Sequence, residues 1–393
     1  MTTPAPTTPQ RKRDPLGARQ VRAFGTRPFL LVTLLVTCSR VVAGQRREAT
    51  PSPRDSAIHV AITKSRTFIR DTMRILGAPD ASVCVARDGR IVWSEAFGLA
   101  DIEGQVRATP LTEFRVGSVS KALTSAAIGL LVQEGELDLD APVQRYVPSF
   151  PPKEWPISTR QLAGHLAGIR HYRPGEFESR RRYSSVLDGL SIFSADSLLF
   201  HPGSQFLYSS YGWNLISAVI EGAAGEPFLS FMQDSIFRPL GMTHTLGDHP
   251  DSLVRLRARA YVHPDSTESR VINALYVDDT YKWASGGLLS TAEDLCRYGD
   301  GLLAGRLLRP ETVRLLWTAQ ATTDGKPTGY GLGWYVVRDT SGAKIVWHTG
   351  GAEGSSALFA IYTDERLVLA ILVNSDRSFV EGAGRIARWF LGQ

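Results

Sequence analysis

Strand patterns occupy both ends of this chain and helical patterns occupy its middle, and this order restricts the possible folds more than any other feature. Residues 82–86 and 91–94 are short apolar runs, and Asp88-Gly89 between them predicts a tight hairpin turn. From residue 124 to about 274 the periodicity is mostly helical, with connections rich in Pro and Gly. Four further strands are predicted late in the chain, at 332–338, 344–348, 358–362 and 367–373. The order predicts a discontinuous α/β domain that carries a helical insertion.

The same patterns give the expected domain boundaries. We predict one domain over residues 58–393, opened by a helix through Ile62 and Ile75 and closed by a helix over 381–390. Its α/β part would consist of residues 58–130 and 283–393, and the helical insertion would span about 131–282. Residues 45–57, which contain Pro and charged side chains, are predicted to be a linker.

Residues 1–44 have the pattern of a secretory signal or an N-terminal anchor. Seven Arg and Lys side chains against a single Asp are followed by the apolar run 29–38 and by the small residues Val42-Ala43-Gly44. We therefore expect an exported protein, periplasmic or secreted, whose contact with a membrane is through this segment only. An uncleaved anchor, a buried segment and a lipidated Cys38 are the alternatives.

Composition excludes several classes of protein. The chain has 43% hydrophobic residues but no run of about 20 apolar residues, which excludes a multi-span membrane protein. The leader carries more than the whole net charge of +5, so the remaining chain gives no reason to expect a nucleic-acid partner. Outside the leader there are two cysteines, Cys84 and Cys296, which could form a disulfide or remain two buried thiols. The oligomeric state is left open.

The strongest candidate for chemistry is the pair Ser118 and Lys121. An apolar helical run follows, so Ser118 would lie at a helix start with Lys121 one turn later on the same face. A serine hydroxyl needs a nearby base, and a buried lysine with a lowered pKa can be that base. The alternative is a plain helix cap beside a surface lysine. The same spacing recurs at Ser341 and Lys344, but in a predicted hairpin turn.

Two later segments strengthen this interpretation. Tyr208 and Ser210 precede a predicted helix, and a loop tyrosine can relay a proton. The segment His348-Thr349-Gly350-Gly351 ends a predicted strand and offers a hydroxyl and closely approaching backbone donors. Taken singly, Tyr208 could be an ordinary loop residue and His348 a surface residue at a strand end.

In this order and spacing the motifs resemble the serine β-lactamase and penicillin-binding-protein superfamily, which has Ser-x-x-Lys, then Tyr-x-Asn, then Lys/His-Thr-Gly. The resemblance extends from about residue 58 to the C-terminus. It is greatest for the class C β-lactamase-like branch, which includes the serine β-lactamase-like proteins of animal mitochondria. It rests on the segments 114–121, 165–172, 281–287 and 348–351. It implies a β-lactamase/DD-peptidase-like fold, in which an antiparallel sheet flanked by helices packs against a mostly helical insertion.

The resemblance also implies a role for each site residue. Ser118 would be the acylated nucleophile, Lys121 would take its proton, and Tyr208 would transfer protons to the leaving group and from water. The backbone N–H groups of Ser118 and Gly351 would form the oxyanion hole. The expected substrate-binding residues are Ser210, His348, Thr349 and Gly350. No cofactor is expected, and the histidine spacing predicts no metal site.

Two residues depart from the family pattern. Ser210 stands where the family has Asn. His348 stands where the lysine version of the last motif has Lys, and the charge of a histidine depends on pH. These changes favour an esterase, amidase or peptidase over an efficient β-lactamase, acting on a small-molecule or peptide substrate. The competing hypothesis is a binding or scaffold protein on a penicillin-binding fold that has lost catalysis.

Overall fold

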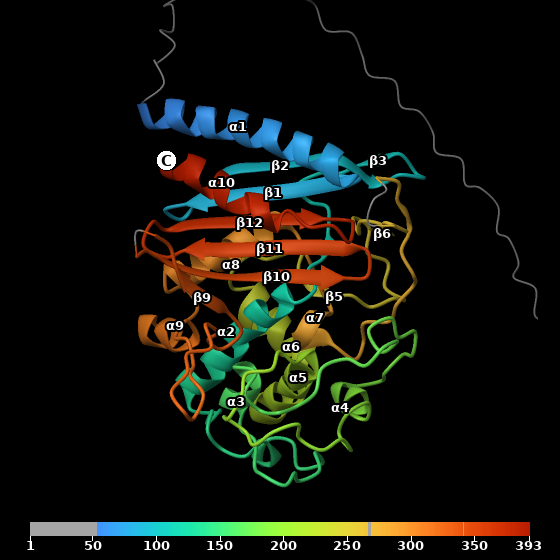
Figure 1. Cartoon of the computed structure of the whole chain (residues 1–393), viewed down its shortest axis with the longest axis vertical. Coiled ribbons are helices and arrows are strands. Elements are labelled where there is room, and N and C mark those ends of the chain that lie inside the picture. Colours follow the sequence, from blue (N-terminus) through green and yellow to red (C-terminus); the bar gives the residue numbers. More distant parts are fainter. Residues whose placement is uncertain (1–52, 266–268, 341) are drawn as a thin grey trace, which may run out of the picture. The chain divides into compact units, whose positions relative to one another are not determined.

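Seven antiparallel strands form the central sheet of the computed structural model, which describes residues 53–265, 269–340 and 342–393. The strand order is β3-β2-β1-β12-β11-β10-β9 (Figure 1). The strands are β1 (Asp80–Arg87), β2 (Arg90–Asp101), β3 (Val106–Arg107), β9 (Tyr335–Arg338), β10 (Lys344–Ala352), β11 (Ser355–Tyr362) and β12 (Leu367–Val373). Because β1 pairs with β12, strands from both ends of the described chain join into one sheet, as the sequence predicted.

The central strands separate two hydrophobic cores. Every residue of β12 is buried, and its side chains alternate between the two faces. Leu369 and Ile371 belong to the core on one face, whereas Val368 and Leu372 belong to the core on the other. A strand buried on both faces is an uninterrupted apolar run, which explains why residues 367–373 were recognisable as a strand.

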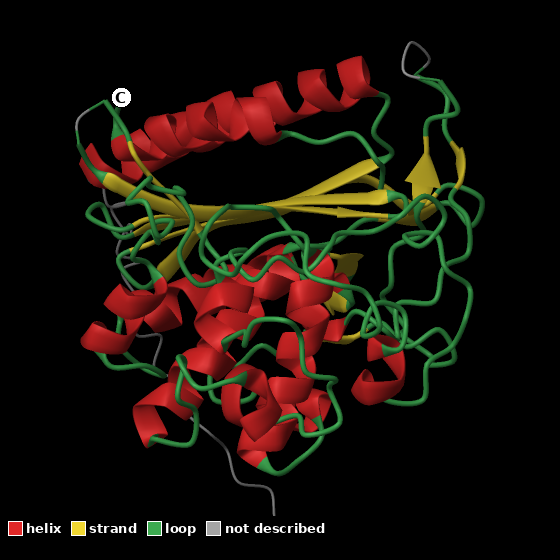
Figure 2. Cartoon of the chain, turned by 60° about the horizontal axis from the view of Figure 1, so that its bottom comes forward, coloured by secondary structure: helices red, strands yellow, loops and turns green. Residues whose placement is uncertain are grey.

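Two helices from opposite ends of the described chain cover the outer face of the sheet. Figure 2 shows α1 (Pro53–Leu76) and α10 (Val380–Leu391) together on this side, with the other helices on the opposite side. The ring of Trp93 in β2 stacks on Phe390 in α10 with centroids 5.9 Å apart. The predicted linker ended too late, because α1 already begins at Pro53. Residues 1–52, with the predicted leader and the rest of that linker, lie outside the described residues.

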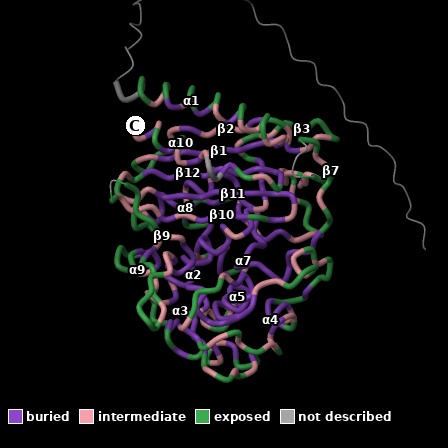
Figure 3. Tube along the Cα trace, viewed as in Figure 1, coloured by how far each residue is buried: buried purple, intermediate pink, exposed green. Residues whose placement is uncertain are grey.

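The inner face of the sheet packs on a helical layer. Its longest members are α2 (Val119–Glu134) and α5 (Ser210–Ala224), which are buried along most of their lengths (Figure 3). The other members are α3 (Thr159–Ala163), α4 (Val186–Leu190), α6 (Phe228–Phe231), α7 (Trp283–Gly286), α8 (Ala292–Leu303), α9 (Pro310–Leu316), the 3-10 turn η1 (Val143–Arg145) and the π turn η2 (Met232–Phe237). The region 131–282 therefore consists mainly of helices and loops. Its core is continuous with the inner face of the sheet.

Short strands connect these layers. β4 (Phe114–Arg115) and β5 (Leu246–Gly247) both pair with β8 (Leu288–Ser290), and β6 (Tyr261–Val262) pairs with β7 (Ile272–Asn273). β4 leads directly into the segment that precedes α2. Its pairing with β8 therefore fixes the approach of the chain to Ser118.

One predicted strand begins later than expected. β9 starts at Tyr335, whereas the sequence pattern began at residue 332. The intervening residues form a turn in which Gly333 has φ +89° and the N–H of Gly331 donates to the carbonyl of Trp334. This turn buries Trp334, whose indole N–H donates to Ser125 Oγ in α2 at 2.8 Å.

Cys84 and Cys296 are both buried free thiols, so the structure supports that alternative over a disulfide. Across the described part of the chain, no individual helix has the length and apolar character to cross a membrane. One sharply bent pair, α5 with the segment Phe228–Phe237, meets that test by length and composition.

Candidate active site

Ser118 occupies the N-terminal cap of α2, immediately after a sharp turn. Gly117 before it has φ +49°, a left-handed conformation that favours glycine. The Ser118 side chain makes no capping hydrogen bond. Instead, Lys121 Nζ lies 2.9 Å from its Oγ. The hydroxyl is thus directed at the lysine, which argues against the plain helix cap as the role of Ser118.

Lys121 is completely buried, with no exposed surface. Its Nζ donates to the Ser285 carbonyl at 2.6 Å and to Ser210 Oγ at 3.2 Å. Burial holds the pKa of Lys121 well below its ordinary value, and the positive charge of Lys282 lowers it further. An amine with a lowered pKa can hold a free lone pair near neutral pH, as a base for Ser118 requires.

Tyr208 lies beside both residues, in the loop before α5. Lys121 Nζ is 4.9 Å from the centroid of the Tyr208 ring, and Tyr208 and Ser118 line the same cleft. Burial raises the pKa of Tyr208 above its ordinary value. The phenol is therefore protonated at neutral pH, in the form that can donate a proton.

Two imidazoles hold this loop in place from the segment after α3. The backbone N–H of Ser209 donates to His165 Nδ1 at 3.0 Å, and that of Ser210 donates to His171 Nδ1 at 3.2 Å. Both nitrogens must be unprotonated to accept. Burial, with the Lys121 charge, lowers the pKa of His171 to about 4, and the same causes hold the pKa of His165 well below its ordinary value. Two neutral histidines thus position the residues that follow Tyr208.

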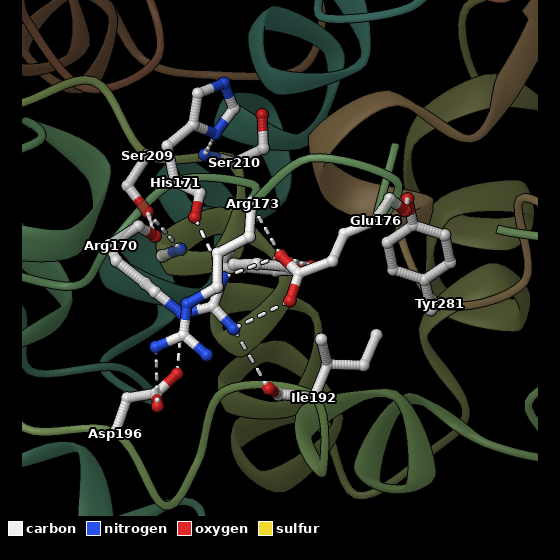
Figure 4. A network of polar contacts seen from close by, with 11 residues as sticks. Arg170, His171, Arg173, Glu176, Ile192, Asp196, Ser209, Ser210 and Tyr281 are labelled. Atoms are coloured by element: carbon white, nitrogen blue, oxygen red, sulfur yellow. Dashed lines mark hydrogen bonds and ion pairs between the residues drawn. The ribbon is translucent and has the colours of Figure 1, made fainter. Parts of the chain in front are cut away.

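Arg170 anchors the same segment through a buried ionic network (Figure 4). Its guanidinium donates to Asp196 at 2.5 Å and to Glu176 at 2.7 and 3.0 Å. Its backbone carbonyl accepts from Ser209 Oγ at 2.7 Å. Because one residue binds both the carboxylates and the loop, the network fixes where Tyr208 and Ser210 lie.

His348 lies behind the cleft, on the inner face of β10, and is almost completely buried. Its Nε2 is 2.9 Å from the Tyr330 hydroxyl, and its Nδ1 is 2.5 Å from the Thr349 carbonyl. A carbonyl only accepts, so Nδ1 carries the proton and Nε2 accepts from the Tyr330 hydroxyl. Burial and the Lys121 charge lower the pKa of His348 to about 3, so this imidazole is neutral near pH 7.

The structure gathers most of the predicted site residues around one cleft of about 440 Å³. Ser118, Tyr208, Ser210 and Gly351 line it, and Lys121 lies beneath. Thr349 and Gly350 do not contribute to its wall. Strand alternation places Thr349 on the opposite face from His348, and Gly350 packs against the Val116 carbonyl.

Several residues of the site were not singled out from the sequence. They include Ser285 and Lys282, which line the cleft, and His165, His171 and Tyr330. One signal pointed to Lys282: it is one of only seven lysines and lies in the apolar stretch 281–289. The segments 165–172 and 281–287 carried the family resemblance, but no chemical role could be read from their residue types alone.

Within residues 53–265, 269–340 and 342–393, no group of three or more His, Cys, Asp or Glu side chains is arranged to hold a metal ion. The contacts described above point to the hydroxyls of Ser118 and Tyr208 and the amine of Lys121 as the reacting groups.

Comparisons with known proteins agree with this geometry. The beta-lactamase family model matches residues 66–392. The serine beta-lactamase-like protein LACTB, mitochondrial, of Homo sapiens is 33% identical, over 80% of this chain and 75% of that protein. The octameric penicillin-binding protein homologue from Pyrococcus abyssi superimposes with a TM-score of 0.74 at 24% identity, over 84% of this chain and 78% of that one. A D-stereospecific amidohydrolase from Streptomyces sp. gives a TM-score of 0.64 at 26% identity, over 82% and 94%. This chain therefore belongs to the beta-lactamase family of serine hydrolases.

Proposed function

We propose that this protein hydrolyses an ester, amide or peptide bond through an acyl-enzyme formed on Ser118. The observation that carries the proposal is the 2.9 Å contact between Ser118 Oγ and the buried amine of Lys121. A completely buried lysine at the foot of a cleft lined by the serine has the properties of a general base.

The reaction steps follow from the positions of these groups. Lys121 takes the Ser118 proton as Oγ attacks the substrate carbonyl. The backbone N–H groups of Ser118 and Gly351, on the cleft wall, would stabilise the negative charge that develops on the carbonyl oxygen. Tyr208, on the same cleft as Ser118, gives a proton to the leaving group and later accepts one from the attacking water, and Lys121 returns its proton to Ser118 Oγ as the acyl group leaves.

The substrate class follows from two side chains. Ser210 Oγ accepts from Lys121 Nζ, and a serine carries no amide that could bind an acyl substituent. His348 is neutral and has no place on the cleft wall, so it does not attract a substrate carboxylate. We therefore expect simple esters, amides or peptides to be better substrates than β-lactams. The D-stereospecific amidohydrolase among the similar structures is consistent with an amide substrate.

Active-site labelling separates this proposal from a binding protein without catalysis. A fluorophosphonate or a fluorescent penicillin should label the wild-type protein at Ser118, whereas a scaffold should remain unlabelled. Turnover of p-nitrophenyl esters, D-Ala-D-Ala peptides and nitrocefin by one preparation would then identify the preferred bond. Nitrocefin turned over far faster than the esters and peptides would contradict the substrate class.

We further propose that residues 1–44 direct export and that any membrane association passes through this segment. The mass of protein recovered outside the cytoplasm tests this directly. A mature species without these residues supports cleavage, and one that begins at a lipidated Cys38 supports an anchor. A cytoplasmic species that begins at Met1 would contradict export.

A further inference from the structure

Two lysines are buried among the described residues, and the chemistry described so far uses one of them. Lys121 and Lys282 are 0% and 2% exposed. Lysine is almost never fully buried without a partner. The partner of Lys282 is Asp279, whose Oδ1 is 2.9 Å from Lys282 Nζ. The ammonium also lies 4.4 Å from the ring centroid of Phe177 and 5.3 Å from that of Tyr281, where aromatic faces stabilise a positive charge.

Lys282 belongs to the turn that Lys121 contacts. Its carbonyl accepts from the N–H groups of Ser285, Gly286 and Gly287 at 3.1, 2.8 and 2.9 Å. This arrangement presents the Ser285 carbonyl to Lys121 Nζ at 2.6 Å. The side chain of Lys282 lines the same cleft as Ser118. Two lysines, one from α2 and one from the residue before α7, thus approach one site.

A second cation at this site has a function because position 348 does not supply one. The residue there is a neutral histidine, hydrogen-bonded to Tyr330. We propose that Lys282 is the positive charge that keeps Lys121 unprotonated before acylation. Lys121 is then ready to accept the proton of Ser118. The inference rests on the proposed role of Lys121 as the base.

The other groups around Lys121 carry no charge near neutral pH. Ser118, Ser210 and Tyr208 present hydroxyls. His165, His171 and His348 are neutral, because burial and Lys121 itself lower the pKa of each. Burial is the largest cause of the lowered pKa of Lys121, and the Lys282 charge is the next. Asp279 pairs with Lys282 and also interacts with the charge of Arg115 in β4, so it offsets part of the positive charge of Lys282.

The test is the pH dependence of Ser118 labelling by an uncharged fluorophosphonate, which needs no knowledge of the natural substrate. The labelling rate should rise with pH as Lys121 loses its proton. Removing a neighbouring positive charge raises the pKa of Lys121, so in Lys282→Met this rise should move about one pH unit higher. At pH values below the rise, the rate should fall roughly tenfold. Lys282→Arg keeps the charge and should retain the wild-type pH profile.

Lys282→Met leaves the Asp279 carboxylate buried without its partner, which threatens folding. The double variant Lys282→Met/Asp279→Asn removes both charges and keeps the volumes similar. Its pH profile should lie between those of the wild type and Lys282→Met. Lys344→Met, at the far end of β10 from the cleft, is the matched control and should leave the profile unchanged.

The outcomes are distinct. A double variant with the wild-type pH profile would overturn the inference, even if the single variant fails to fold. So would a Lys282→Met protein whose labelling falls by the same factor at every pH, since that result indicates a structural role only. If the wild-type protein does not label at Ser118 at all, the proposed function itself fails.

Discussion

Gly350 packs backbone to backbone against Val116, so closely that a Cβ atom at position 350 would lie 1.9 Å from the Val116 carbonyl oxygen. Gly117 meets the same strand one residue further on, where a Cβ would lie 2.5 Å from the Gly351 carbonyl oxygen. These two glycines let β10 approach the turn that carries Ser118. Glycine at position 350 thus allows the backbone of β10 to lie close to that of the turn before Ser118. Gly351 is the residue that faces the cleft.

We predict that Gly350→Ala separates β10 from this turn. Unfolding by denaturant should show a loss of about 1–3 kcal/mol, the usual cost of overpacking, and labelling of Ser118 should slow at least tenfold. Gly351→Ala is the matched control for stability, because a Cβ there would meet no atom within 4 Å. Equal losses of stability in the two variants would contradict the close-approach explanation.

Ser118→Ala should abolish covalent labelling and reduce turnover by roughly 10³-fold or more, as loss of a serine nucleophile does in other hydrolases. Ser341→Ala is the control, since it removes the serine of the second Ser-x-x-Lys pattern. Mass spectrometry of the labelled peptide measures the labelling of both variants, and a turnover assay measures their activity. Label retained on Ser118→Ala protein, or equal effects of the two substitutions, would show that the nucleophile is misassigned.

The neutral histidines should make stability depend on pH. The pKa of His348 is about 3 in the folded protein, below the unfolded value of about 6.5. The unfolded chain therefore binds the proton first, and the contribution of His348 is complete above about pH 6.5 and is lost as pH falls toward 3. At pH 5 this loss should be about 2 kcal/mol.

His348→Gln should reduce the difference in unfolding free energy between pH 7 and pH 5 by about 2 kcal/mol, while His165 and His171 keep their own contributions. His59→Gln, which replaces an exposed histidine of α1, should leave the difference between the two pH values unchanged. A His348→Gln protein with the wild-type difference would show that His348 is not the group that titrates.

Arg170 is predicted to stabilise the fold far more than an exposed arginine does. Arg170→Met leaves the partly exposed carboxylates of Glu176 and Asp196 without their buried partner and should cost about 1–3 kcal/mol of unfolding free energy. Arg145→Met, which removes an exposed pair 3.9 Å from Asp138, should cost about 0–1 kcal/mol. Similar losses in both variants would contradict the anchoring role of the network.

The framework of the fold was accessible from sequence because its strands are strongly patterned. Residues 367–373 and the Asp88-Gly89 turn were located correctly, and the helices after Ser118 and Tyr208 followed from apolar periodicity. The start of β9 was missed, because a turn at Gly333 buries Trp334 under α2 through a contact between distant segments. The start of α1 was placed five residues late, since its first turn contains a proline that is also typical of linkers.

The site residues that belong to a recognisable sequence motif could be predicted. The structure brings Ser118, Lys121, Tyr208 and Ser210 together, and their roles in the reaction await the experiments above. The partners of these residues were not predictable in the same way. Lys282, His171 and Tyr330 act through distances that depend on the packing of three separate elements, and a residue type alone does not reveal such proximity.

The pairing of β1 with β12 has a consequence for synthesis on the ribosome. β1 and β2 emerge early, but the strand that lies between β1 and β11 is complete only when residue 373 has been made. Until then β1 presents an open apolar edge, and β10, which carries Gly351, has no connection to β1 through β11 and β12. The nascent chain can therefore join the two parts of its central sheet only after residue 373 has been made, and an arrest before that point leaves β1 and β11 apart.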